Sequence, residues 1–482
     1  MNTMTIKHIT AYIAAAGLLF NLTACSDFLE EQSQSEVIPK TANDFRELLM
    51  GSGYLNNDDE PFGFTYLLDD DVEFQHDSPI APGSSASAQY QPTYSWQPSF
   101  VDIDGIGQQV AETPNKTAYA KYYERIMGCN AVLDNIEGSI GSQEQKDRVR
   151  AEALAMRAFY YFRLTNIYGD PYSKNPEGLA VPLKLRSDVD PLYSQRASVK
   201  AVYQQVLADL QEAARLLDPL QIVRGDFHIN QRTIHILLSR VYLYMEDWDN
   251  CIAEANRVFE MGGRIAVLPA MSTNPDGTPI PSTYLTYDNP EVEWVYGGNT
   301  QPVQFPYIPN RAFIQSFVQN DARASYFSYK ANTNNHLLSK LPAKPDLGQV
   351  IRSSEALLNR AEAYAQKQEV ALGTKDLNQL RSNRISDYSE VSFGSAEELL
   401  QAVRDERRKE FCYEGFRWFD LRRYGMPAIT HTYQAAPGEA VVTYTLEKED
   451  PMYVLPFPKS LTSRNVQLIQ NPSAKMPDRV AQ

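Results

Sequence analysis

Charged and aromatic side chains are concentrated between residues 404 and 425, in the stretch "RDERRKEFCYEGFRWFDLRRYG". Two carboxylates such as Glu410 and Glu414 are the residue types that general acid and base catalysis uses. A carboxylate among so many arginines stays ionised, however, and makes a poor acid. Charges four residues apart, as in Asp405 and Lys409, can pair on one helix face, and arginine also stacks on aromatic rings. We therefore interpret the stretch as scaffolding that fixes a helix end in the core.

Composition and motifs disfavour several other kinds of chemistry. The net charge of −15 opposes binding to the phosphate backbone of nucleic acid, and the charges within residues 404–425 nearly balance. The sequence contains neither GxSxG nor HExxH, and its six histidines are scattered without the spacing of a metal site or a catalytic triad. A surface glycoside hydrolase that uses two loop carboxylates remains the alternative from the enzyme class.

A short acidic run could in principle bind a metal. Asp69, Asp70 and Asp71 lie in "LDDDVEF", and carboxylate oxygens are the ligands that calcium prefers. The sequence has no recognisable twelve-residue calcium loop. We therefore expect a solvated or capping acidic turn, and we predict no cofactor.

The N-terminus indicates export. An apolar run at residues 9–20 follows Lys7 and has the length of a secretory signal, too short to span a bilayer. It is followed by "LTAC", which resembles the lipobox of bacterial lipoproteins and predicts lipid attachment at Cys25. We thus expect a signal peptide over residues 1–24, an acidic tether over residues 25–40, and a protein held at a membrane by its lipid.

The other cysteines are Cys129, Cys251 and Cys412. Each stands alone among apolar and aromatic neighbours, without the CxxC spacing of a zinc site. We predict that all three are buried free thiols.

Apolar residues recur at helical spacing in three parts of the chain. In the first part, residues 134–145 form a connection so short that the helices on either side should pack antiparallel, and Gly169 ends the second of them. In the second part, Asp247 lies in an acidic turn between two helices, as in tetratricopeptide-like repeats. In the third, Ser395 and Glu398 predict a capping box. The predicted helical segments are residues 117–136, 146–170, 199–217, 230–263, 353–367, 374–384 and 393–411.

These segments predict an all-α fold, a scaffold of tetratricopeptide-like helix pairs with long irregular loop insertions and few short strands. The insertions are predicted at residues 56–114 and 266–345, which are rich in proline, tyrosine and polar residues. Loops on a rigid scaffold are where binding residues usually lie.

Several long motifs resemble the RagB/SusD family of surface nutrient-binding lipoproteins of the Bacteroidetes. They include "YYERIMGCNAVLDNI", "RAEALAMRAFYYFRLTNIYGDP", "LLNRAEAYAQ", the stretch at residues 404–425 and "YVLPFPKSLTSRNVQLIQNP". They occur in the family's order from the lipobox to the C-terminal part. The resemblance implies one SusD-like domain over residues 41–482, with an N-terminal part (41–265), a loop-rich insertion (266–345) and a C-terminal signature part (346–482).

The resemblance also implies a function. Members bind oligomeric nutrients at the cell surface and deliver them to a SusC-like TonB-dependent transporter in the outer membrane, without catalysis. The cargo is an oligosaccharide, or a peptide as in the RagB branch, and this alternative stays open.

Aromatic side chains in the insertions are the candidates for cargo contact, because sugar faces stack on aromatic rings while polar side chains bind the hydroxyls. For Trp96 and Trp294 a place in the framework is favoured over ligand contact, whereas Tyr90 and Tyr307, with proline and polar neighbours, are better placed for it. The candidate ligand-binding residues are Tyr90, Tyr94, Trp96, Trp294, Tyr296, Asn299 and Tyr307.

Overall fold

A computed structural model of the chain describes residues 38–57, 63–76, 78, 80–102, 118–188, 195–270, 272, 280, 283–298, 306–330, 335–338, 340 and 347–482. Residues 41–482 form one structural unit, and the fold below is that of this unit. Within the described residues, no helix has both the length and the apolar character needed to cross a membrane.

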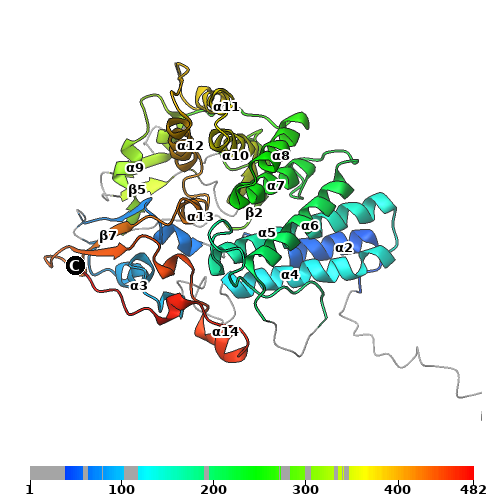
Figure 1. The fold of residues 1–482 in the computed structure, drawn as a ribbon, viewed down its shortest axis with the longest axis horizontal. Helices are drawn as coiled ribbons and strands as arrows, with labels where there is room; N and C mark the ends of the chain where they lie inside the picture. Colours follow the sequence, from blue (N-terminus) through cyan, green and yellow to red (C-terminus); the bar gives the residue numbers. More distant parts are fainter. Residues whose placement is uncertain are drawn as a thin grey trace, which may run out of the picture. The chain divides into compact units, whose positions relative to one another are not determined.

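Helices dominate the described chain and lie in two groups (Figure 1). The helices of the N-terminal half are α2 (Ala42–Leu48), α3 (Ser85–Tyr94), α4 (Ala118–Asn135), α5 (Gln143–Tyr168), α6 (Val199–Leu217), α7 (Gln231–Met245) and α8 (Trp248–Glu260). Those of the C-terminal half are α9 (Arg311–Gln315), α10 (Ser353–Gln366), α11 (Val370–Ser382), α12 (Ala396–Glu410), α13 (Arg417–Arg423) and α14 (Lys459–Arg464).

The strands are few and short, as the sequence predicted, and those of the described residues form four antiparallel pairs. Two of the four pairs, β1 with β3 and β2 with β6, join distant parts of the chain. The pairs are β1 (Val72–Phe74) with β3 (Tyr307–Pro309), β2 (Val292–Tyr296) with β6 (Gln349–Arg352), β4 (Phe327–Lys330) with β5 (Asn335–Leu338), and β7 (Ile429–Tyr433) with β8 (Val442–Leu446).

The predicted antiparallel pair of α4 and α5 is confirmed, and α6 packs along α5 (Figure 1). The N-terminus of α5 is fixed by a capping box between Ser142 and Gln145, and Gly169 follows its last residue. Gly128 in α4 lies against the backbone of Ser52, where an added Cβ would be 2.2 Å from the carbonyl oxygen. Glycine is therefore required at this close approach despite its low helix propensity.

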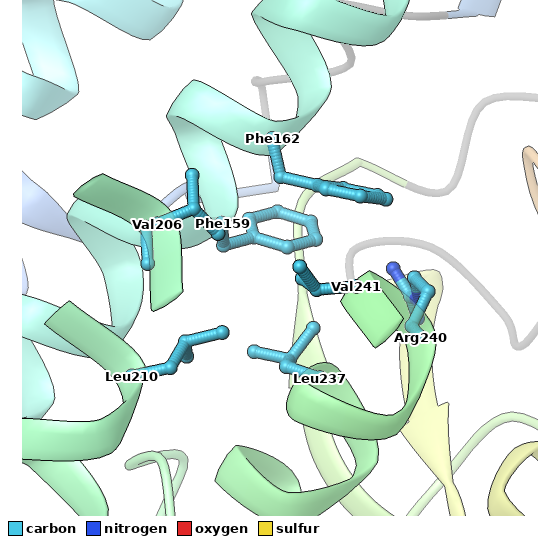
Figure 2. Close-up of a pocket in the computed structure, with 8 residues that line it drawn as sticks. Phe159, Phe162, Val206, Leu210, Leu237, Arg240 and Val241 are labelled. Carbon is cyan, nitrogen blue, oxygen red and sulfur yellow. The ribbon is translucent and has the colours of Figure 1, made fainter. Parts of the chain in front are cut away.

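A closely packed junction joins α5, α6 and α7. Figure 2 shows Phe159 and Phe162 of α5 beside Leu210 of α6 and Leu237 of α7, and the space between them leaves no room for a water molecule. Such packing is that of a protein interior rather than of a binding pocket. Arg240 lies at its edge, where this junction meets the second helical group.

The two groups do not coincide with the two halves of the sequence. Helices α7 and α8 of the N-terminal half pack with α10, α11 and α12 of the C-terminal half, and these five form the second group (Figure 1). Asp247 lies in the turn between α7 and α8, as expected. The structure adds that it caps α8, accepting a hydrogen bond from the backbone N–H of Asn250. The capping box predicted for α12 is half right. The Ser395 hydroxyl accepts from the backbone N–H of Glu398, but the Glu398 carboxylate accepts from Gly394 instead of Ser395.

The insertion at residues 56–114 is not all loop. It contains α3, which begins at the Ser84 cap and carries Pro92 in its last turn. Serine, glutamine and proline give this segment little helix propensity. Burial of Ser87, Thr93 and Tyr94 against the rest of the unit stabilises the helix instead.

Candidate functional site

The charged stretch at residues 404–425 is a buried network of ion pairs. Glu410 is fully buried and accepts hydrogen bonds from Arg323 (3.0 Å), Arg384 (2.8 Å) and Arg352. Burial acts to raise the pKa of Glu410, but the charges of Arg384 and Arg352 outweigh it and hold the pKa well below its ordinary value. Glu410 therefore stays ionised and cannot serve as a general acid.

Asp420 and Glu362 complete this network. Asp420 is paired with Arg407 (2.9 Å) and Arg423 (2.8 Å), and Arg423 also pairs with Glu362 (2.6 Å). Burial acts to raise the pKa of Asp420, and the two arginines lower it below its ordinary value. Every charge in this part of the stretch has a partner, as the scaffolding interpretation requires.

The acidic turn at residues 69–71 is used by arginines of the same stretch. Asp70 binds Arg417 through two hydrogen bonds of 2.6 and 2.8 Å, and Asp71 binds Arg408 at 2.6 Å. Asp69 accepts from the backbone N–H of Asp71. The described residues contain no group of three His, Cys, Asp or Glu side chains placed to hold a metal ion.

Cys129, Cys251 and Cys412 are buried and free, which confirms the prediction for these three residues. Burial raises the pKa of Cys129 and of Cys412 to about 12, and it also raises the pKa of Cys251. The thiols are therefore protonated at neutral pH and are not nucleophiles.

Three of the candidate aromatic residues form part of the core around β7. Tyr94, Trp96 and Tyr307 are each 1% exposed. His431 lies between the rings of Tyr94 and Trp96, with centroid distances of 4.1 and 4.2 Å. Burial lowers the pKa of His431 to about 4, so the stack is uncharged at neutral pH. The expectation that these three rings face a ligand is corrected, because no ring surface is accessible.

Trp294 and Tyr296 of β2 are also core residues, 0% and 2% exposed. Their rings stack at 4.5 Å, and both pack edge-on against Phe159 of α5. This corrects the expectation of ligand contact for both. Trp96 and Trp294 are therefore framework residues, which was the alternative to ligand contact for both. Asn299 and Cys25 lie outside the described residues.

Tyr90 is the one described candidate that reaches the surface. It is half-buried, and its ring packs edge-on against Tyr307 at 6.2 Å. Gln91 and Tyr444 of β8 are half-buried beside the same core. This edge combines aromatic surface with amide and hydroxyl groups.

The loop-rich insertion contains an open cleft with a volume of about 140 Å³. Its walls are residues 266–269, residues 283–284 and 288–291, and Tyr326. Tyr284 and Tyr326 form the floor and are almost fully buried, with Tyr326 donating to the carbonyl of Pro269 at 3.2 Å. Val267 is 75% exposed at the rim. Apolar walls and polar groups of this kind suit a small polar ligand.

Sequence reasoning expected binding residues in this insertion but missed the residues that line the cleft. The available signal was the density of tyrosine and acidic residues in "STYLTYDNPE" at residues 282–291. Trp294, three residues further on, was predicted to contact the ligand because it is aromatic. It belongs to strand β2 and is buried.

Comparison with known proteins gives two matches to family models. Residues 27–243 match a SusD-like model described as starch-binding and associating with the outer membrane, and residues 315–473 match the model of the SusD family. Two SusD-like proteins of Formosa agariphila are similar, P25 at 23% identity over 51% of this chain and P38 at 21% over 56%. The matched parts span 44% and 65% of the length of these relatives.

Solved structures share the fold. A SusD superfamily protein of Bacteroides thetaiotaomicron is similar over 90% of this chain and 100% of its own, with a TM-score of 0.67 and 24% identity. A protein of Bacteroides vulgatus described as SusD-like and carbohydrate-binding is similar over 89% of this chain and 97% of its own, with a TM-score of 0.65 and 20% identity.

Proposed function

The chain belongs to the SusD/RagB family, and we propose that it binds oligosaccharides at the cell surface and passes them to a SusC-like TonB-dependent transporter of the outer membrane. The observation that carries the proposal is the match of residues 27–243 to a model described as starch-binding and associating with the outer membrane. The relative described as carbohydrate-binding, whose fold this chain shares, supports the same class of ligand.

The geometry is consistent with binding rather than bond cleavage. The cleft of the loop-rich insertion is open and carries both apolar and polar groups, whereas Glu410, Asp420 and Glu362 are buried and tied to arginines. An oligosaccharide that covers one or two aromatic surfaces, offset by the cost of ordering it, binds with a dissociation constant on the order of micromolar to millimolar. Weak binding suits a protein that must release its cargo to a transporter.

Attachment to the outer membrane is the second part of the proposal. A lipid on Cys25 would hold the chain there without a membrane-spanning helix. Cells that express the Cys25→Ser variant should release the protein from the membrane fraction, and the Ser26→Ala variant should remain in it. Retention of the Cys25→Ser variant in washed membranes would contradict lipid anchoring at this residue.

A binding and turnover assay tests the cargo. The purified protein is incubated with labelled oligosaccharides and peptides of matched length, and binding is measured by calorimetry while products are followed by chromatography. We expect an oligosaccharide to bind and to be recovered intact. Binding of peptides alone would assign the cargo to the peptide class, and cleavage of any ligand by the pure protein would contradict the non-catalytic role.

Association with the transporter can be tested separately. A tagged copy of this protein, solubilised from outer membranes, should copurify with a TonB-dependent transporter in a fixed ratio. Recovery of the protein alone under mild detergent conditions would contradict delivery through a stable complex.

A further inference from the structure

The described residues that line the cleft of the loop-rich insertion include two acidic side chains, Asp288 and Glu291. Its described lining contains no lysine, arginine or histidine. Glu291 is paired with Arg384 behind the wall, and the backbone N–H of Ala266 also donates to it at 2.9 Å. Asp288 is exposed, and within the described part of the chain its carboxylate has no hydrogen-bond or ion-pair partner. Among the described residues that line the cleft, Asp288 therefore presents an unpaired negative charge and no side chain presents a positive one. The nearby Arg224 guanidinium lies over the Tyr287 ring, outside this lining.

The turn that carries Asp288 is held by Arg224, from the connection between α6 and α7. The Arg224 guanidinium donates to the carbonyl of Val292 at 2.7 Å, to that of Tyr287 at 2.9 Å and to that of Asn289. Three carbonyls fixed by one guanidinium make a rigid wall. The cleft thus needs little ordering when a ligand enters.

The same connection presents an aromatic ring beside this turn. Residues 221–228 alternate between exposed and half-buried positions, and the inward side chains Arg224, Asp226 and His228 are all tied down. Phe227 points outward. It is 48% exposed, and its ring meets that of Tyr287 edge-on at 5.4 Å.

Phe227 also has an unusual backbone. Its φ is +66°, in the left-handed region that a bulky residue rarely adopts. The conformation belongs to a turn outside any helix, in which the Asp226 carboxylate accepts a hydrogen bond from the backbone N–H of His228 at 3.1 Å. Strained residues held by their surroundings cluster at binding sites. An exposed ring that packs on Tyr287, beside Asp288 of the cleft wall, offers a surface on which a sugar face can stack.

We propose that this cleft, walled by residues 266–269, 283–284 and 288–291, binds neutral oligosaccharides and rejects acidic ones, with Asp288 as its hydroxyl acceptor. The exposed Phe227 ring does not line the cleft but packs on Tyr287 beside Asp288, where it offers an adjoining surface to a sugar face. The proposal rests on the proposed function and deepens it by naming the site and the ligand class. A uronate or sulfate group would lie near the Asp288 carboxylate with no cation in the described lining to offset the repulsion. A neutral sugar can donate its hydroxyls to that carboxylate.

The test compares neutral and acidic oligosaccharides of the same length. Hexamers of glucose, xylose and mannose are titrated against hexamers of galacturonate and of sulfated galactose, at low and high salt. At least one neutral hexamer should bind, with an affinity that barely depends on salt, and the acidic ones should not. Phe227→Ala should weaken the neutral binding by about three- to tenfold, from the loss of one aromatic contact.

Matched variants make the test specific. Ile140 is 70% exposed and does not line the cleft, so Ile140→Ala should leave binding unchanged. Asp288→Asn should weaken binding of the neutral hexamer. It should also reduce the difference in affinity between the neutral hexamer and the galacturonate hexamer. Thermal unfolding of each variant confirms that it is folded.

The possible results separate this inference from the proposed function. Binding of an acidic hexamer by the native protein, or neutral binding that is insensitive to both Phe227→Ala and Asp288→Asn, overturns the inference while the proposed function stands. Absence of binding to any glycan in the panel, together with binding of a peptide, overturns both.

Discussion

Asp70 and Arg417 are 347 positions apart in the chain, yet the Arg417 guanidinium binds both carboxylate oxygens of Asp70, from Nε at 2.6 Å and from Nη2 at 2.8 Å. The pair joins the acidic turn before β1 to helix α13. Burial acts to raise the pKa of Asp70, but Arg417 lowers it below its ordinary value. A run of aspartates that could have suggested a metal site therefore serves to fasten the C-terminal signature to the N-terminal part.

A double-mutant cycle on Asp70 and Arg417 should give a favourable coupling energy of about 1–2 kcal/mol, because the pair is bidentate and partly buried. The free energy of unfolding in urea is measured for Asp70→Ala, Arg417→Ala and the double variant. Strictly additive effects of the two substitutions would show that the pair contributes nothing beyond its separate side chains.

Asp420→Ala should destabilise the protein by about 3–5 kcal/mol, since it leaves Arg407 and Arg423 buried with fewer partners. Asp405 provides the control, because it is exposed on the preceding helix α12, and Asp405→Ala should change the free energy of unfolding by less than about 0.5 kcal/mol. Equal denaturation midpoints for native protein and Asp420→Ala would be incompatible with the scaffold role of residues 404–425.

His235 should make stability depend on pH on the alkaline side. Burial opposes its protonation, but hydrogen bonds with Asp218 and Glu254 outweigh that effect and raise the pKa of His235 to about 9. Because the pKa of His235 is higher in the folded than in the unfolded state, its charged contacts stabilise the folded state fully below the unfolded pKa near 6.5. This stabilisation is lost as the pH rises through the folded pKa of about 9. The loss is on the order of 3 kcal/mol, at about 1.4 kcal/mol per pH unit.

The measurement for His235 is the free energy of unfolding of native protein and His235→Gln between pH 6 and pH 10. The difference between them should shrink as the pH rises, because the variant lacks the titrating charge. A constant difference across this range would mean that the Asp218 and Glu254 contacts do not hold a charged imidazole.

The buried rings and the exposed ring should respond in opposite ways to truncation. Trp96→Ala should cost about 3–5 kcal/mol of stability, since it removes a fully buried ring between Leu68 and His431. Phe227→Ala should leave stability nearly unchanged, because the ring is 48% exposed and alanine keeps the same backbone penalty at positive φ. Chemical denaturation of both variants checks this. A large loss for Phe227→Ala would place that ring in the core.

Thiol reactivity tests the burial of three cysteines. Cys129, Cys251 and Cys412 should not react with Ellman's reagent in the native protein, because they are buried and burial raises the pKa of each. All three should react in concentrated guanidinium chloride. Rapid modification of any of them under native conditions, located by peptide mapping, would show that its surroundings open.

The amino-acid sequence by itself determined the helical scaffold. Apolar periodicity identified α4, α5, α6, α7 and α8, and the caps at Asp247 and Ser395 set where two helices begin, because these signals act over a few neighbouring residues. It also indicated that residues 404–425 are scaffolding, although most of their charged partners, such as Asp70, Asp71 and Arg384, lie elsewhere in the chain. That interpretation needs only the density of opposite charges, not the identity of each partner.

Only the tertiary structure decided which aromatic rings are accessible. Trp96 and Tyr307 have polar and proline neighbours, and Trp294 lies in the same loop-rich insertion as Tyr307, yet all three rings are buried. The segments that cover them are distant in the sequence, such as β7 against Trp96. Phe227, in contrast, lies in an unremarkable connection and is exposed because Arg224, Asp226 and His228 hold that connection to other parts of the unit. Exposure depends on long-range contacts, which local sequence patterns do not encode.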